Sequence, residues 1–190
     1  MKCPVCSAAS LHRTTLESCL NASSCSDCNG KWITATDYWA WLNHHGETLP
    51  EQEADECSIK ADDIQKAKLC PNCRRIMIRQ KVGHNLDFSL DQCGSCNGIW
   101  FDANKWEALK QRNLHGEVHL ISSGPWQSEN RKDNTRQSLK TIYADMFDDD
   151  YEKIKQIKAW IDHHPNQDKI LNYLSNPNPY VIGSTNVGYC

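Results

Sequence analysis

The feature that constrains this chain most is a cysteine pattern that occurs twice. Residues 3–41 and 70–109 each begin with Cys-Pro-x-Cys and later continue with Cys-x-x-Cys-Asn-Gly-x-Trp. The interval between the inner cysteines is 18 residues in the first copy and 19 in the second. The copies also share a tryptophan, at Trp32 and Trp100. An internal repeat of paired cysteines predicts one small metal-stabilised unit per copy.

Coordination geometry explains why the cysteines come in pairs. Zinc prefers four ligands in a tetrahedron, and two cysteines two residues apart reach the same ion if a tight turn joins them. Pro4 and Pro71 fix φ for such a turn. Gly30 and Gly98 are expected to adopt a positive φ just after the last cysteine. We therefore predict two zinc ribbons that bind two Zn²⁺ ions through Cys3, Cys6, Cys25, Cys28 and through Cys70, Cys73, Cys93, Cys96.

Paired cysteines have other uses, which the sequence weighs differently. Disulfides are disfavoured because the 11 cysteines are odd in number, partners two residues apart would be strained, and residues 1–3 show no apolar signal segment. A thioredoxin-like redox pair should open a helix after a strand and would not occur as two matched pairs. An iron–sulfur cluster also takes four thiolates and stays an alternative. Zinc thiolates indicate a reducing compartment, with the cytoplasm as the expected location.

The run Cys-Pro-x-Cys … Cys-x-x-Cys-x-Gly-x-Trp, followed by a short helix, resembles the bacterial zinc-finger proteins related to the transcription factor IIB zinc ribbon. In that family the tryptophan is usually followed by Leu-Asp. The second copy has Phe101-Asp102, which is close to the pattern, and the first has Ile33-Thr34, which departs from it. The resemblance covers about residues 1–45 and 68–112. It implies a zinc-binding ribbon fold, with transcription suggested by the family's name.

The expected fold class is a small metal-stabilised α+β protein, with two tandem zinc ribbons followed by an α-helical unit. Each ribbon would consist of a β-hairpin and a short helix. Between the ribbons, residues 47–63 carry seven acids and one lysine without an apolar period, which is typical of a solvated spacer that lets the ribbons move. The predicted divisions are a first ribbon at 1–46, an acidic linker at 47–67, a second ribbon at 68–112, a helical region at 113–180 and a loose tail at 181–190.

Local patterns predict the elements of each ribbon. Thr36 is expected to cap a helix whose aromatic residues pack against the first ribbon. In the second ribbon, Ile76 and Ile78 alternate with polar residues and are expected on the buried face of a hairpin that turns at residues 82–85. Asp102 or Asn104 is expected to cap the helix that follows.

Beyond residue 112 the apolar residues follow helical spacing. We expect three apolar stripes that pack on one another as a small helical unit. The stripes are Leu139, Ile142, Tyr143 and Met146, then Tyr151, Ile154, Ile157, Trp160 and Ile161, and finally Ile170, Leu171 and Leu174.

No catalytic motif accompanies the cysteines: the sequence has no phosphate-binding glycine loop, no Gly-x-Ser-x-Gly and no His-Glu-x-x-His. Four-thiolate zinc sites are closed, so the metal is expected to stabilise the fold. Cys19, Cys57 and Cys190 lie outside the pattern and are predicted not to be ligands. The expected function is a non-enzymatic protein-interaction or adaptor module.

Charge provides the main argument about partners. The net charge is −3, which disfavours a general nucleic-acid binder, and no apolar run is long enough to predict a membrane span. The hairpin of the second ribbon is locally basic, and a solvated face is the preferred interpretation of this charge. The alternative function is a nucleic-acid- or transcription-machinery-associated factor that contacts phosphates through Arg74, Arg75, Arg79 and Lys81.

Overall fold

The structure is a computed structural model that describes residues 1–44, 50–51 and 59–180. The chain divides into two compact units, Met1–Asn134 and Thr135–Cys190. No helix in the described residues combines the length and apolar character that crossing a bilayer requires. His45, Cys57, Cys190, the predicted tail and most of residues 45–58 lie outside the described residues.

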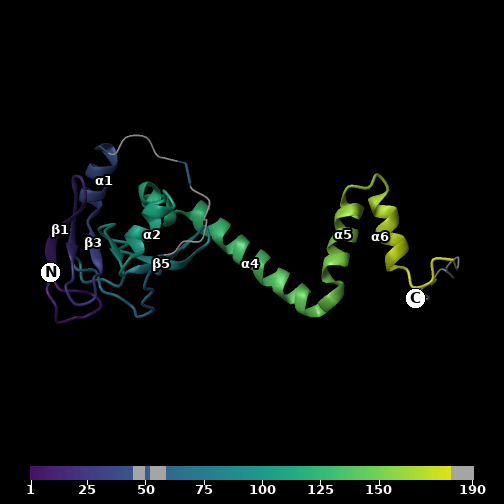
Figure 1. Ribbon diagram of the computed structural model, residues 1–190, viewed down its shortest axis with the longest axis horizontal. Coiled ribbons are helices and arrows are strands. Elements are labelled where there is room, and N and C mark those ends of the chain that lie inside the picture. The colour runs from purple at the N-terminus through teal and green to yellow at the C-terminus, as the bar shows by residue number, and fades with distance from the viewer. Residues whose placement is uncertain (45–49, 52–58, 181–190) are drawn as a thin grey trace, which may run out of the picture. The chain divides into compact units, whose positions relative to one another are not determined.

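The first unit is built around a single six-stranded antiparallel sheet to which both ribbons contribute (Figure 1). The strand order is β1-β2-β3-β6-β5-β4. The strands are β1 (His12–Glu17), β2 (Leu20–Ser24), β3 (Lys31–Ile33), β4 (Ile78–Gly83), β5 (Leu86–Gln92) and β6 (Ile99–Phe101).

The two ribbons join where β3 pairs with β6. Trp32 lies opposite Trp100 in this pair, and Ile33 lies opposite Ile99. Because backbone hydrogen bonds connect the ribbons in one sheet, the expectation that they move relative to each other is wrong.

Side-chain alternation along these strands separates two cores. Ile33, Ile99 and Phe101 point into the larger core, which the helices of the unit cover. Trp32 and Trp100 point the other way and pack with the cysteines in a second cluster. The sheet therefore carries its metal-binding cysteines on the side opposite its main apolar core.

The helices of the first unit begin differently from the sequence prediction. α1 (Ala35–His44) is capped by Thr34, whose Oγ1 accepts the Asp37 N–H at 3.1 Å, so the assignment of Thr36 as the cap is wrong. α2 (Lys105–Gln111) begins after Asn104, which has a left-handed backbone and no side-chain cap. Asp102 is no side-chain cap either, because its carboxylate instead pairs with Lys68 and Lys105. Short helices η1 (His115–Glu117) and α3 (Val118–Ile121) follow.

The β4–β5 hairpin turns at His84 and Asn85, both of which have positive φ. Met77, just before β4, and Val82, within β4, are buried, whereas Ile76 is 68% exposed and Ile78 is 54% exposed. The predicted buried face was therefore wrong at both isoleucines. The hairpin is held by α4 (Gly124–Phe147), since Trp126 Nε1 and Asn130 Nδ2 donate to the Val82 carbonyl at 2.8 and 3.1 Å.

The described part of the predicted linker is packed against the second ribbon. Ile59 and Ala61 lie against the main core. Near the start of the linker, Glu51 accepts hydrogen bonds from Arg112 at 2.6 Å and from His84 at 2.8 Å if that ring nitrogen carries a proton. The interpretation as a solvated spacer is therefore wrong for these residues.

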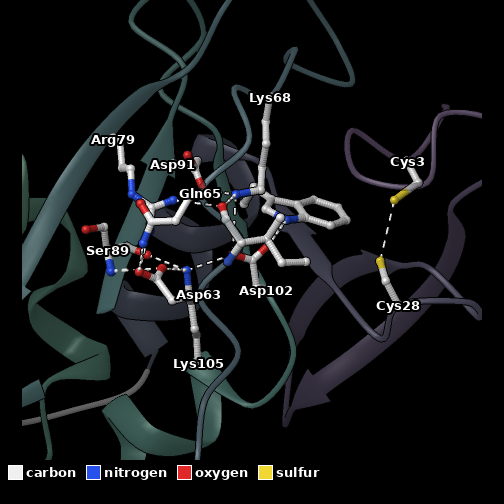
Figure 2. A network of polar contacts seen from close by, with 12 residues as sticks. Cys3, Cys28, Asp63, Gln65, Lys68, Arg79, Ser89, Asp91, Asp102 and Lys105 are labelled. Atoms are coloured by element: carbon white, nitrogen blue, oxygen red, sulfur yellow. Dashed lines mark hydrogen bonds and ion pairs between the residues drawn. The ribbon is translucent and has the colours of Figure 1, made fainter. Parts of the chain in front are cut away.

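A buried ion-pair network fixes the linker just before Cys70 (Figure 2). The Lys68 ammonium lies 2.7 Å from Asp91 and 3.3 Å from Asp102. Lys68 and Lys105, the two lysines of the network, are both fully buried. The second lysine, Lys105, binds Asp102 at 2.8 Å and Asp63 at 2.7 Å. Arg79 also pairs with Asp63.

The network also places Trp100 and the backbone of the linker. Trp100 Nε1 donates to Asp102 at 2.8 Å, and the backbone N–H of Ile64 donates to the same carboxylate at 3.2 Å. Burial acts against the charged form of Asp63, but Lys105 and Arg79 hold its pKa below the ordinary value. Burial raises the pKa of Asp91 despite the adjacent Lys68.

The substitution Lys68→Met tests the importance of this network. It removes one buried cation and leaves Asp91 without its ammonium partner, so we expect the free energy of unfolding to fall by about 3–5 kcal/mol. Denaturant titration of the zinc-loaded protein measures the change. Lys66→Met, at an exposed site two residues away, is the control and should stay within about 0.5 kcal/mol of the parent. Equal stabilities of the two variants would contradict the prediction.

The second unit contains the end of α4, the short η2 (Asp148–Asp150), α5 (Tyr151–Asp162) and α6 (Gln167–Ser175). The helices occur where the apolar spacing predicts them, and α5 and α6 lie side by side (Figure 1). The stripes, however, do not bury one another. Ile161 is buried and Tyr151 is half-buried, but the other members of the stripes that begin at Leu139 and Tyr151 remain exposed, as do Leu171 and Leu174. The predicted packing of three stripes is therefore wrong.

Candidate metal centres

The first candidate centre gathers four sulfur atoms from two loops. Cys3 and Cys6 lie in the N-terminal loop, and Cys25 and Cys28 follow β2. Their Sγ atoms all lie within 4.8 Å of one another. The Cys3–Cys28 and Cys6–Cys25 sulfur pairs are 3.6 and 3.9 Å apart. Four sulfurs at about 2.3 Å from a tetrahedral zinc ion would be about 3.8 Å apart, so the geometry fits Zn²⁺.

The second centre repeats this arrangement with Cys70, Cys73, Cys93 and Cys96. The sulfurs of Cys70 and Cys96 are 3.6 Å apart. This distance is far longer than a disulfide bond, whose sulfurs are about 2.05 Å apart, and all these cysteines are free. The eight predicted ligand residues are thus brought together as two groups of four, which supports two zinc ions per chain.

Each cysteine pair forms the same backbone turn. The residue directly after the second cysteine has positive φ in all four pairs: Ser7, Asn29, Arg74 and Asn97. Its N–H donates to the carbonyl of the first cysteine at 2.9–3.0 Å, as in Asn29 to Cys25 at 3.0 Å and Asn97 to Cys93 at 2.9 Å. Asparagine tolerates this left-handed conformation, which explains the Cys-Asn-Gly run.

The two repeat glycines have a different role from the predicted one. Gly30 and Gly98 do not have positive φ. An ideal Cβ on Gly30 would lie 2.1 Å from Cζ2 of Trp100, and one on Gly98 would lie 2.3 Å from Cζ2 of Trp32. Each glycine therefore makes room for the tryptophan of the other ribbon.

The substitutions Gly30→Ala and Gly98→Ala test these reciprocal contacts. The added methyl group would overlap a buried indole, so we expect each variant to lose about 1–3 kcal/mol of unfolding free energy when zinc-loaded. Gly124→Ala is the control, because a Cβ there meets nothing within 4 Å. Thermal and denaturant unfolding measure the effect. The prediction fails if Gly98→Ala is as stable as Gly124→Ala.

The environment of the sulfurs favours thiolates at equivalent positions of the two centres. Burial works against charge at Cys93, but the backbone N–H groups of Cys96 and Ser95 outweigh it and lower the pKa of Cys93 to about 7. The same combination of burial and backbone hydrogen bonds, from Cys28 and Asp27, lowers the pKa of Cys25. Burial raises the pKa of Cys6 to about 11. Zinc would displace the remaining thiol protons, so metal affinity would fall with decreasing pH.

The ligand set of both centres is that of a closed four-thiolate zinc site. Each group consists of four cysteines, with no histidine or carboxylate among the grouped residues. A catalytic zinc usually has three protein ligands and an open position. Cys19 lies in the exposed β1–β2 turn, outside both groups, as the cysteine pattern predicts.

Residues 69–112 match the family described as transcription factor zinc-finger. The match spans the second ribbon, with its four cysteines and α2. No curated protein and no solved structure matches the chain. The family match and the two cysteine groups together support a zinc-binding module.

The structure separates the four basic residues that the sequence grouped for the nucleic-acid alternative. Arg74 and Arg75 are exposed. Arg79 is half-buried, pairs with Asp63 and donates to the Ile64 carbonyl at 2.9 Å. Lys81 is 3.6 Å from Asp87 and contacts Asn134. Two of the four cations are thus engaged within the protein.

Sequence reasoning missed an exposed apolar patch next to the second centre. Leu69, Ile76 and Ile78 are all exposed, and Leu69 forms a β-bridge with Ile76. The bridge that buries Met77 turns the neighbouring isoleucines outward. No signal in the alternation distinguishes this register from the opposite one, because residues 76–78 are all apolar.

Elemental analysis tests the metal content. We expect two zinc ions per chain for the purified protein, and about one when Cys25→Ser or Cys93→Ser is assayed in excess zinc, since each variant removes one ligand of a closed site. Cys19→Ser is the matched control and should retain two. Iron in place of zinc, or loss of zinc from the Cys19→Ser variant, would contradict the assignment. A chelator should unfold the first unit before the helical second unit.

Proposed function

We propose that this chain is a non-enzymatic protein-interaction module of a reducing compartment such as the cytoplasm, in which both zinc ions are structural. The closed four-cysteine centres support a structural role, because zinc in such sites contributes folding free energy on the order of 10 kcal/mol. The cysteines fix the loops on which an interaction surface can be built.

One exposed surface carries this proposal, and we call it the knuckle face. It consists of Leu69, Arg74, Arg75, Ile76 and Ile78. Leu69 is 42% exposed and forms a β-bridge with Ile76. The Arg75 carbonyl accepts the Cys70 N–H at 2.8 Å. These residues therefore surround the turn between Cys70 and Cys73, the first cysteine pair (or knuckle) of the second centre. Exposed apolar side chains beside arginines are typical of protein interfaces. The charge favours an acidic partner surface with an apolar centre.

A nucleic-acid-associated factor is the second candidate. The family match to transcription factor zinc-fingers and the exposed Arg74 and Arg75 favour it. The engagement of Arg79 by Asp63 and the net charge of −3 argue against an extended phosphate-binding track. We therefore place it second.

The two candidates differ in which part of the knuckle face they use. The test begins with capture of partners from the source cell on the zinc-loaded protein, followed by titration of each identified protein in purified form. We expect Ile76→Ser with Ile78→Ser to weaken that binding at least tenfold. Leu120→Ser, at another exposed apolar residue, should leave it unchanged.

Nucleic-acid binding is measured in parallel by fluorescence anisotropy across a range of salt concentrations. Binding that falls steeply with salt and weakens in Arg74→Ala with Arg75→Ala, but not in the isoleucine variant, would favour the second candidate and contradict the first. The isoleucine variant should keep two zinc ions and remain within about 0.5 kcal/mol of the parent stability, because both side chains are exposed.

A further inference from the structure

The second unit exposes apolar surface that a helical unit of this size normally buries. One part, which we call the α4 stripe, consists of Leu139, Ile142, Tyr143 and Met146 at spacings of three and four residues. These positions share one face of a helix. All four are exposed, and Met146 reaches 63%. An uncovered stripe of this kind is the pattern of a helix that docks in an apolar groove.

The same unit contains such a groove. The α5–α6 groove has a volume of about 540 Å³ and is lined mainly by Ile157, Trp160, Ile170, Tyr173 and Leu174, with Lys169 among its lining residues. Trp160 is 57% exposed at this site. The groove is open and apolar, and it presents one cation.

Within one chain the stripe and the groove do not cover each other. η2 (Asp148–Asp150) joins α4 directly to α5, and both the stripe and the groove-lining Trp160 and Leu174 remain exposed. A second copy of the chain would supply a groove for the stripe and a stripe for the groove. One other partner would have to fit two different surfaces.

The α4 segment that carries the stripe is acidic, and the groove carries one lysine that can meet it. Residues 139–150 contain four aspartates and one lysine, whereas residues 151–175 contain four lysines and three acids. Of the lysines in α5, Lys153, Lys155 and Lys158 pair with neighbouring acids on their own helix or its start. Asp145 lies between Ile142 and Met146 in sequence. Neither Asp145 nor Lys169 has an ion-pair partner among the described residues.

We propose that the chain forms a twofold dimer in which the α4 stripe of each copy packs in the α5–α6 groove of the other. Asp145 of one copy lies near Lys169 of the second. Because the exchange is reciprocal, both apolar surfaces are covered at once and the assembly closes at two copies. This inference uses none of the residues of the knuckle face, so its outcome is independent of the proposed function.

Sedimentation velocity of the full zinc-loaded chain across concentrations is the first test. We expect a dimer for the parent protein and at least a tenfold weaker association for Ile142→Glu and for Trp160→Ser. Gln137→Glu adds the same charge to an exposed site on the opposite side of α4 and should associate like the parent. Circular dichroism verifies that each variant keeps its helices.

A charge exchange tests the orientation of the dimer. Asp145→Lys and Lys169→Asp should each weaken association, and the double variant should restore it, because the ion pair is then reversed across the interface. Three results would overturn the proposal. These are a monomer at all concentrations, a dimer unaffected by both Ile142→Glu and Trp160→Ser, or a double variant that associates no more tightly than the single ones.

Discussion

The contact on which the first unit depends is the reciprocal packing of tryptophan and glycine between the ribbons. Trp32 fits over Gly98 and Trp100 over Gly30, while the two indoles lie opposite each other in the β3–β6 pair. A single ribbon would expose its tryptophan and the unpaired edge of its last strand. The sheet therefore needs both repeats. The glycine beside each metal centre packs against the tryptophan of the other repeat.

The repeats differ at one position that accounts for much of their asymmetry. Trp100 donates its indole N–H to Asp102, which also anchors Lys68 and Lys105. The first repeat has Thr34 at the equivalent position, where it caps α1. Trp32 Nε1 is buried and has no partner among the described residues. Consequently, Asp102 of the second ribbon anchors the linker through Lys68, whereas Thr34 of the first ribbon caps α1.

The sequence predicts the metal centres well because coordination chemistry ties function to fixed spacings. All eight cysteines, the two hairpins and the helices of the second unit follow from local patterns. Local patterns do not encode which edges pair, so the β3–β6 junction was not predictable. The acidic composition of the linker hid Asp63, whose charge is balanced by Lys105 and Arg79 only after folding. Because residues 76–78 are all apolar, the sequence did not determine which of their side chains would be buried.

The tryptophan–glycine exchange has a consequence for how the chain fills with metal. Folding around the first ion would order the indole that packs on the repeat glycine of the other centre, so the second ion would meet a partly formed site. Such a linkage would make binding of the two ions positively cooperative. At limiting zinc the population would divide between empty and fully loaded chains, with few in between. The protein would then respond to zinc supply more steeply than two independent ribbons.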